Sequence, residues 1–559
     1  MNRNKNTRLL LWGIIFLAIL IRFINLDRIP NGFIPEEVST GWNAFSLLKT
    51  GRDEWGTRLP LVFRETGGFK LALNSYLIVP VMALFGVNEF SVRAPTAFAG
   101  VLAVWLTYEL VKLLFKRDTH ALSAALLLAI SPWHIAMGRY GVDVNWGIPL
   151  FLGGLILFLK SEKKPAYLAG SGILFALTYY TYFNFVVFTF LFLAGILFYF
   201  RKRLWQPEFR RYVLIFVVTQ FLFMLPYVLQ ANLTIRYSQA TSVEKIGLVN
   251  QIHEHREACG KMYPLIICRI FYNKPLTFGL TIVRNYINHF STTPYFLHGA
   301  EFGPSGMPKG WGFMYPFEFG LLLIGTYVMI RRQMLPLVLI LWLFLYGLPS
   351  SLAAETHIWR MLTVLPLPQI TAGVGLIALV KKFPHLVFKT ILAGIILFSA
   401  FQFMLDYTSY FPYAQAANSY YGFRETYAYL KTIESGYDHI VIAPTGLGFD
   451  QLYIYYVFYM QSDPRKYQLG TDIERLVGEQ GWVKVKRIGK WYFESDVRNV
   501  IFSLPDKTLF VTDGTFNEYE PLPKRVMFPK LLQTISYPNG NPAFKILELT
   551  KNPEYSPEE

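Results

Sequence analysis

Charged residues and cysteines are both scarce in this chain. Asp, Glu, Lys and Arg together make up 16% of its residues, whereas soluble domains contain about a quarter. The only two cysteines, Cys259 and Cys268, cannot form a metal site by themselves, although a disulfide between them is possible. The glycine-rich phosphate loops of nucleotide-binding enzymes are also missing. These absences argue against a soluble enzyme that uses a nucleotide.

Long apolar runs are the main feature that is present. Hydrophobic residues account for 53% of the chain and aromatic residues for 17%, and runs close to 20 residues recur from Leu9 to about Leu405. Because hydrocarbon offers no partners to backbone polar groups, runs this continuous indicate membrane-spanning helices rather than barrel strands. About eleven spans, and at most about thirteen, are expected. They cover residues 9–26, 91–111, 119–137, 145–160, 166–182, 185–200, 212–230, 317–330, 333–353, 362–380 and 388–405.

The distribution of positive charge predicts the topology. The net charge of +16 could by itself indicate a nucleic-acid or anionic-lipid partner. Lysines and arginines, however, concentrate on one side of the expected spans, and the short loops on the other side carry little more than Arg139 and Arg360. The positive-inside rule then places the N-terminus in the cytoplasm. We expect a multi-pass protein of the plasma (inner) membrane, with the lipid bilayer and no nucleic acid as its partner.

Two domains follow from this topology. Residues 1–405 form the expected transmembrane domain, with long outer loops at residues 27–90 and 231–316. Residues 406–559 contain alternating, polar-interrupted segments and are expected to form an extracytoplasmic α/β or α+β domain. Within it, Val483–Arg487 alternates apolar with basic residues, which is typical of an edge strand. A long loop such as 231–316 is more often functional than passive.

An acidic pair, Glu36-Glu37, stands in the first outer loop, about ten residues beyond the first apolar run. Carboxylates are expensive to hold beside hydrocarbon, and ionisable groups in such surroundings cluster at functional sites. The pair is therefore a candidate for a catalytic base. The alternative is that both glutamates only keep the loop solvated.

Other ionisable residues of the outer loops fall on the same membrane face. A sugar linked to a lipid phosphate would need cations to hold the phosphate and a carboxylate to accept the proton of the attacking group. Each residue also has a structural alternative, namely snorkelling to headgroups or pairing within its own loop. A divalent metal held by Glu36, Asp143 and a histidine is conceivable, although no ligand spacing supports it. The candidates are the acid Asp143 and the basic residues Lys70, Arg93, Arg139, His357 and Arg360.

Several blocks, in this order and at these spacings, make the chain resemble the GT-C superfamily of glycosyltransferases. It is most similar to the bacterial relatives of protein O-mannosyltransferases and of the lipid A aminoarabinose transferase. The blocks extend through essentially the whole membrane part. They are Pro35–Gly56, Phe69-Lys70 with Ser91-Val-Arg93, Ser131-Pro-Trp-His134, Asn285-Tyr286 with His289-Phe290, Gly310 with Tyr315-Pro-Phe-Glu318, and Pro349 with His357-Ile-Trp-Arg360.

The resemblance implies a GT-C fold, a polyprenyl-phosphate sugar donor, an outward-facing active site and inversion at the anomeric carbon. It assigns the base role to Glu36, with Glu37 beside it. It also matches Asp143 to the acid of the second outer loop, and Lys70 to the lysine that meets the donor phosphate. Two positions depart from the family, since Glu36 replaces a leading Asp and Leu71-Ala72 replaces a proline pair.

We therefore hypothesise an integral membrane glycosyltransferase that moves a sugar from a polyprenyl-phosphate carrier to an extracytoplasmic protein, lipid or cell-envelope glycan. Glu36, Glu37 and Asp143 would be catalytic, and the five basic residues would bind the donor phosphate. The external domain and loop 231–316 would shape the acceptor site. One alternative is a lipid-linked-sugar transporter or flippase, which would need charges within its spans. The other is an inactive GT-C protein that binds glycans, for which the Glu36 replacement is suggestive.

Overall fold

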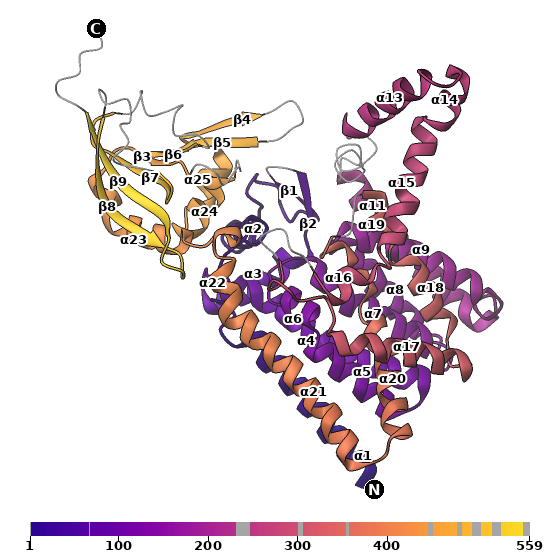
Figure 1. Cartoon of the computed structure of the whole chain (residues 1–559). Coiled ribbons are helices and arrows are strands. Elements are labelled where there is room, and N and C mark those ends of the chain that lie inside the picture. Colours follow the sequence, from indigo (N-terminus) through magenta and orange to yellow (C-terminus); the bar gives the residue numbers. More distant parts are fainter. Residues whose placement is uncertain are drawn as a thin grey trace.

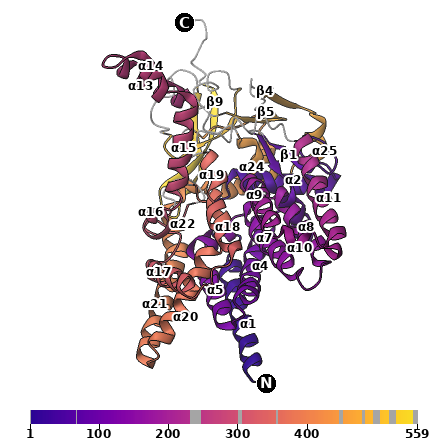
Figure 2. The ribbon, with the colours of Figure 1, turned by 90° about the vertical axis from the view of Figure 1, so that its right-hand side faces the viewer.

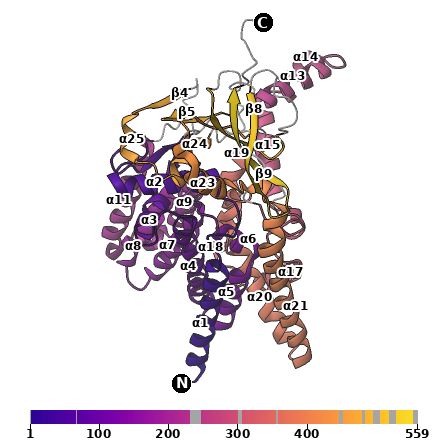
Figure 3. The ribbon, with the colours of Figure 1, turned by 90° about the vertical axis from the view of Figure 1, so that its left-hand side faces the viewer.

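A computed structural model of the chain describes residues 2–65, 68–230, 246–299, 306–353, 357–444, 451–477, 483–494, 505–516 and 527–551. It has two parts (Figure 1): a bundle of helices that contains the N-terminus, and a sheet with flanking helices towards the C-terminus. Helices α1 (Asn2–Phe23) and α21 (Leu386–Leu405) both extend to the end of the bundle opposite the sheet (Figures 1 and 3).

Each apolar run that was expected to span the membrane forms a helix or a helix pair. The run at 119–137 is a bent pair, and the run at 333–353 is divided between two short helices. Besides α1 and α21, these helices are α4 (Glu89–Phe115), α5 (Asp118–Ile130), α6 (Pro132–Gly138), α7 (Val144–Lys160), α8 (Tyr167–Leu177), α9 (Phe183–Tyr199), α11 (Pro207–Gln230), α17 (Pro316–Arg331), α18 (Leu337–Leu345), α19 (Leu348–Ala353) and α20 (Leu367–Lys382).

Length and hydropathy separate these helices into two groups. Among the described residues, four helical segments are long and apolar enough to cross a membrane: Lys5–Phe23, Glu89–Phe115, Pro207–Pro226 and Leu386–Ala414. The pair α5 and α6, bent by 58° at its break, would make a fifth. The other apolar helices are shorter. The chain is therefore a multi-pass membrane protein, and its total number of spans stays a prediction.

The first outer loop folds into two helices and a hairpin. Helix α2 (Pro35–Thr50) starts with Pro35, a position where no helical N–H bond is lost, and Gly51 ends it at a φ of 66°. The hairpin of β1 (Val62–Glu65) and β2 (Gly68–Leu71) leads into α3 (Leu73–Phe85). This hairpin turns Lys70 back towards the start of α2, where its side chain meets the Glu36 carbonyl group.

The second long outer loop forms a helical arm. Among its described residues, α13 (Ile246–Gly260), α14 (Leu265–Phe271) and α15 (Lys274–Asn288) project from the bundle, with α16 (Thr292–Phe296) at the base (Figure 2). A disulfide between Cys259 and Cys268, which the sequence left open, joins α13 to α14. Residues 231–245 and 300–305 of this loop lie outside the described residues.

The C-terminal part is a mixed α/β domain. Its sheet, as far as the chain is described, has the strand order β4-β5-β6-β3-β7-β9-β8, with β3 parallel to β6 and β7 and the other neighbours antiparallel. The segment Val483–Arg487, expected at an edge, lies in β5 and pairs with β4 on its outer side, so that expectation was wrong. The strands are β3 (Ile440–Ile442), β4 (Ile473–Val477), β5 (Val483–Ile488), β6 (Trp491–Phe493), β7 (Thr508–Asp513), β8 (Met527–Ser536) and β9 (Pro542–Lys551).

Short helices complete both parts of the molecule. In the external domain, α23 and α24 lie beside the sheet (Figure 3). The bounds of the short helices are η1 (Thr178–Tyr180), α10 (Arg201–Leu204), η3 (Arg360–Val364), η4 (Asp406–Tyr410), α22 (Phe411–Ala414), η5 (Ala417–Ser419), α23 (Phe423–Ile433), η6 (Glu434–Gly436), α24 (Leu452–Tyr459) and α25 (Pro464–Leu469).

The C-terminal domain and the loop between α1 and α4, here named the external domain and the first outer loop after their predicted positions, share one hydrophobic core. Trp42 of α2 and Phe33 before it are buried in the same cluster as Tyr455 of α24, and the Tyr455 hydroxyl donates to the Phe33 carbonyl oxygen at 2.7 Å. A Cβ on Gly32 would lie 1.4 Å from the Ser419 carbonyl oxygen, so the two backbones touch there. Because each large apolar side chain contributes about 1.5–3 kcal/mol when buried, this core fixes α2 against the external domain.

Candidate active site

Glu36, Lys70 and Asp143 are brought together by the first two outer loops. Glu36 lies in the first turn of α2 and is partly exposed. The Lys70 Nζ donates a hydrogen bond to the Glu36 carbonyl oxygen at 2.7 Å and another to the Thr40 hydroxyl. It also lies 3.8 Å from Asp143 Oδ1. The side chains of Lys70 and Asp143 are 11% and 7% exposed, so water screens their opposite charges only weakly.

Tyr182 and Arg360 extend this cluster. The Arg360 guanidinium lies within hydrogen-bonding reach of the Tyr182 side chain, and the charges of Asp143 and Glu36 act on the same tyrosine. Tyr182 therefore lies close to all three charged groups. The Asn184 side-chain amide donates to the Arg360 carbonyl oxygen at 3.1 Å, which joins η3 to the start of α9. The sequence did not single out Tyr182, because tyrosines at the end of a span are typical of an aromatic belt.

His357 lies three residues before Arg360, and its hydrogen bonding defines the tautomer of its ring. Desolvation and the Arg360 guanidinium lower the pKa of His357 to about 4, so its ring is neutral at pH 7. The Trp359 backbone N–H donates to His357 Nδ1 at 3.3 Å, which leaves the ring proton on Nε2. His357 can therefore offer a hydrogen-bond donor to an anion, but it brings no positive charge.

Glu37 points in a different direction from Glu36, into the interior. Its carboxylate forms a two-point ion pair with Arg93, with Nε–Oε1 and Nη2–Oε2 distances of 2.8 and 3.0 Å. The Gly141 N–H donates to Glu37 Oε1 at 2.8 Å and the Ile34 N–H to Oε2 at 3.3 Å. Both side chains of the ion pair are completely buried. The pair therefore holds together three segments, namely the start of α2, helix α4 and the loop after α6.

Arg93 and Arg139 both bind the backbone between α1 and α2. Arg93 donates to the carbonyl oxygens of Leu26 and Pro30, at 3.2 and 2.8 Å, and to that of Gly32. Arg139, which is 1% exposed, covers the end of α1, where helical carbonyl groups lack partners. Its acceptors are Ile21 at 2.7 Å, Ile24 at 2.7 Å, Asn25 at 3.2 Å and Ile29 at 2.9 Å. Two of the five predicted phosphate ligands thus lie inside the protein, bonded to carbonyl groups.

The conceivable metal site is not assembled in the part of the chain that the structure describes. In those residues, no group of three or more His, Cys, Asp or Glu side chains is placed to hold a metal ion. Within this described part, Glu36 and Asp143 share their site with Lys70, Tyr182 and Arg360 rather than with a histidine at ligand distance.

An apolar groove begins close to Lys70. It has a volume of about 310 Å³ and lies between the first outer loop and α3 on one side and the ends of α8 and α11 on the other. Ala72, two residues after Lys70, belongs to its wall, so the replacement of the family's proline pair falls at the groove itself. Its lining residues are Leu61, Ala72, Leu73, Tyr76, Leu177, Tyr180, Leu222, Phe223 and Pro226.

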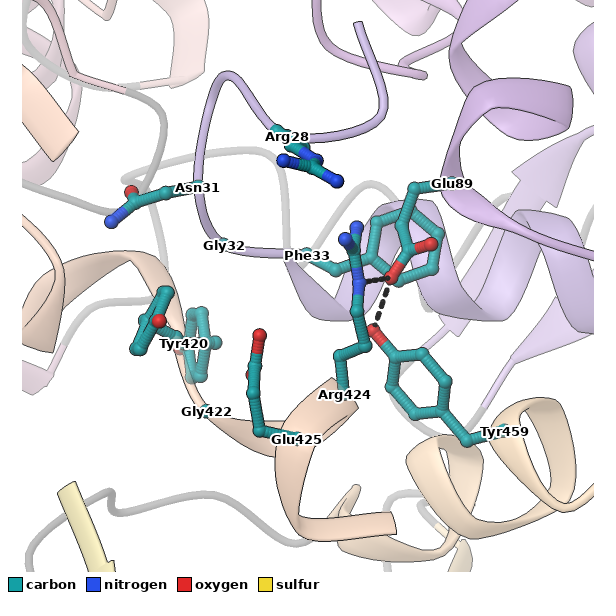
Figure 4. A pocket seen from close by; sticks show the side chains of 11 residues that line it. Arg28, Asn31, Gly32, Phe33, Glu89, Tyr420, Gly422, Arg424, Glu425 and Tyr459 are labelled. Atoms are coloured by element: carbon teal, nitrogen blue, oxygen red, sulfur yellow. Dashed lines mark hydrogen bonds and ion pairs between the residues drawn. The ribbon is translucent and has the colours of Figure 1, made fainter. Parts of the chain in front are cut away.

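A polar pocket of about 340 Å³ lies between the first outer loop and the external domain (Figure 4). At one end, Glu89 Oε1 accepts from Arg424 Nε at 2.7 Å and from the Tyr459 hydroxyl at 2.8 Å. At the other end stands Tyr420, whose pKa is raised by burial and by the charge of Glu36. Tyr420 has a φ of 58°, which is uncommon outside glycine. The charge of Glu36 therefore reaches a residue of the pocket wall, and no local sequence pattern pointed to Tyr420.

Comparison with known proteins agrees with this architecture. Residues 72–228 match the family model described as dolichyl-phosphate-mannose-protein mannosyltransferase. A search of curated protein sequences finds no significant match. The structure of ArnT from Cupriavidus metallidurans bound to undecaprenyl phosphate is similar, with a TM-score of 0.52 and 13% identity over 96% of this chain and 97% of that one. Apo ArnT gives the same values.

An oligosaccharyltransferase from Archaeoglobus fulgidus, solved with Zn and sulfate, is a more remote likeness. Its TM-score is 0.44 and its identity 14%, over 80% of this chain and 61% of that one. The family match and the likeness to ArnT show that the protein has the fold of the GT-C superfamily of membrane glycosyltransferases, as the sequence predicted. The likeness to ArnT extends over 96% of this chain and so takes in most of the C-terminal domain as well as the helical bundle.

Proposed function

We propose that this protein is an inverting glycosyltransferase with a polyprenyl-phosphate sugar as its donor. The observation that supports this most directly is the cluster of Glu36, Lys70 and Asp143 beside an apolar groove. A lipid-linked sugar phosphate has the matching parts, since its tail is apolar, its phosphate is anionic and its sugar is polar. Undecaprenyl phosphate, which is bound in the ArnT structure, belongs to the same chemical class.

The donor phosphate would lie between Lys70 and Arg360. Lys70 is oriented by the Glu36 carbonyl group and the Thr40 hydroxyl. Arg360, the first residue of η3, is held beside this site by its contact with Tyr182. His357 Nε2–H would add a neutral hydrogen bond. We do not assign phosphate binding to Arg93 and Arg139, because the buried carbonyl groups of the α1–α2 connection already occupy them. The prenyl tail would follow the groove that starts at Ala72.

Glu36 would then be the catalytic base. As the acceptor oxygen or nitrogen attacks the anomeric carbon, the Glu36 carboxylate takes the proton of that group. The bond between the anomeric carbon and the phosphate oxygen breaks, and its electron pair leaves with the polyprenyl phosphate. Lys70 and Arg360 stabilise the negative charge that develops on this leaving group. Attack from the face opposite the phosphate inverts the configuration. Asp143 orients Lys70, and Glu37 acts only through its ion pair with Arg93.

The acceptor would enter from the external-domain side. Tyr420 lines the polar pocket and feels the charge of Glu36, so an acceptor in that pocket would lie near the base. Two guanidinium groups, two carboxylates and three tyrosine rings line the pocket, which suits a neutral ligand rich in hydroxyl or amide groups. These residues are Arg28, Arg424, Glu89, Glu425, Tyr420, Tyr421 and Tyr459.

Transfer of sugar from a panel of polyprenyl-phosphate sugars, by the purified full chain in lipid nanodiscs, tests this function. Wild type is expected to release polyprenyl phosphate in the presence of acceptor, and Glu36→Gln to lose at least about a hundredfold in rate, since a general base contributes about 10²–10⁴. Glu162→Gln, the same substitution at an exposed glutamate in the turn after α7, is the matched control and is expected to keep full activity. Equal rates for wild type and Glu36→Gln would remove Glu36 from the base role.

The two alternatives predict different results in the same preparation. A flippase would move a labelled lipid-linked sugar across the bilayer of a vesicle without releasing polyprenyl phosphate. An inactive, glycan-binding protein would bind sugars with wild-type affinity in the Glu36→Gln variant and would release nothing with any donor.

A further inference from the structure

The helical arm carries an apolar surface that the rest of the described chain leaves uncovered. At its tip, in the turn after α13 and in α14, Met262 is 81% exposed, Ile266 66% and Phe271 61%. Tyr263, Leu265 and Ile270 beside them are also more than half exposed. A soluble surface seldom gathers so many large apolar side chains in one place. The Cys259–Cys268 disulfide holds this turn in place by joining its two flanking helices.

A second apolar surface continues from the tip along α15. Leu276, Leu280, Val283, Ile287 and Phe290 are exposed and recur at intervals of four and three residues. This spacing places them on a single stripe of the helix and its first following turn. The opposite face carries Asn285 and, just past the end of α15, His289, and both are buried against the bundle. The stripe therefore faces away from the protein.

The base of the arm joins a region that is expected to face lipid. The Tyr286 hydroxyl donates to the Phe344 carbonyl oxygen of α18 at 2.9 Å, and the Asn285 amide donates to the Ser351 carbonyl oxygen of α19 at 3.3 Å. Helices α18 and α19 form the expected span 333–353, in which Leu343 and Phe344 are exposed. The apolar surface of the arm thus continues the apolar surface of a span.

The charges around the arm also favour a lipid surface. Arg269 flanks the tip and Lys274 begins α15, and both are exposed, whereas Lys261 forms an ion pair with Glu257 at 3.7 Å. Exposed apolar side chains bordered by cations are the pattern of helices that lie in a bilayer interface, where the cations meet lipid phosphates. Figure 2 shows the arm extending well beyond the bundle that supports it.

We propose that this arm lies in the outer interface of the same bilayer, with the tip and the α15 stripe in contact with acyl chains and with Arg269 and Lys274 at headgroup phosphates. The arm then fixes the height of a site residue. The Tyr346 hydroxyl donates to the His289 carbonyl oxygen at 2.8 Å, and the Thr363 hydroxyl donates to the Tyr346 carbonyl oxygen at 3.1 Å. Thr363 belongs to η3, which begins at Arg360. Anchoring the arm would therefore hold Arg360 at the depth of a lipid phosphate.

Spin labels on the full chain test this placement. Single cysteines are introduced at Ile266 and Leu280, labelled without reductant so that the native disulfide stays intact, and measured in nanodiscs of phosphatidylethanolamine and phosphatidylglycerol. Leu397→Cys on α21, 69% exposed, is the lipid reference, and Leu469→Cys in the external domain, 80% exposed, is the water reference. The arm labels are expected to resemble Leu397→Cys, with high accessibility to oxygen and low accessibility to a water-soluble nickel complex.

Two results would overturn the proposal. Arm labels that are as accessible to nickel as the Leu469→Cys label would place the arm in water. Labels that are shielded from both oxygen and nickel would show that protein covers the surface, either a second copy of the chain or another partner. Both readouts are independent of sugar transfer, so they judge the placement of the arm even if the proposed function fails.

Discussion

Replacing Glu37 by Gln tests whether the two adjacent acids really have separate tasks. The Glu37 carboxylate is completely buried and accepts hydrogen bonds from Arg93, Gly141 and Ile34. Gln keeps the shape but removes the charge, and its NH₂ group would face donors that need an acceptor. Arg93 would then remain buried without a counter-charge, which costs about 3–5 kcal/mol. Because folded proteins have only about 5–15 kcal/mol of stability, the unfolding temperature should fall clearly.

The Glu36→Gln variant provides the comparison that tests whether the two acids have separate roles. Glu36 is partly exposed, and changing a solvent-accessible charge costs at most about 1 kcal/mol. Thermal unfolding of both variants, followed by size-exclusion fluorescence in detergent, should therefore show a large loss for Glu37→Gln and little for Glu36→Gln. Sugar transfer per folded molecule should show the reverse order.

A double-mutant cycle separates the ion pair from other effects. Arg93→Met loses the bonds to the Leu26, Pro30 and Gly32 carbonyl groups in either background, but in the Glu37→Gln background it also removes an unpaired buried charge. It should therefore cost less stability there than in wild type. The reasoning would be refuted if Glu37→Gln kept the wild-type unfolding temperature, or if Arg93→Met lowered the stability of the double variant by as much as it does in wild type.

Three further changes probe other parts of the molecule. Lys70→Gln should lower kcat/KM for the lipid donor by roughly 10²–10³, because Lys70 would stabilise the charge on the leaving group, and Lys70→Arg should recover part of that loss. Initial rates measured against donor concentration test this, and equal rates for wild type and Lys70→Gln would exclude contact between Lys70 and the phosphate. Gly32→Ala should cost about 1–3 kcal/mol or more, because its Cβ would overlap the Ser419 carbonyl oxygen, and an unchanged unfolding temperature would contradict that close approach. Replacing Cys259 and Cys268 by Ser should destabilise the arm by about 2–3 kcal/mol. Proteolysis between α13 and α14 should become faster while sugar transfer is retained, whereas an unchanged proteolysis rate would mean that packing alone holds the turn.

The sequence alone determined the architecture of the membrane part. Continuous apolar runs must become helices wherever hydrocarbon cannot bond the backbone, and each predicted run is helical in the structure. The GT-C fold followed from ordered blocks spread over the chain, and the comparisons confirm it. The strand Val483–Arg487 shows the limit of local pattern, because its alternation predicts a strand while β4, which pairs with it, decides that it is not an edge.

Only the tertiary structure decided which acid faces the site. Glu36 and Glu37 are neighbours in one helix turn, where consecutive side chains differ in direction by about 100°. The surroundings of each acid depend on groups far away in the chain. Arg93 and Gly141 donate to the buried Glu37 carboxylate, while Lys70 contacts both the Glu36 carbonyl group and Asp143.

Contacts with distant parts of the chain also decide what each basic residue binds. A guanidinium in an outer loop binds a phosphate or caps a helix according to which carbonyl groups the fold brings to it. The sequence predicted a charged face of the bundle, and the tertiary contacts divide its cations into two pairs. Lys70 and Arg360 lie at the candidate site, whereas Arg93 and Arg139 bind carbonyl groups of the backbone between α1 and α2.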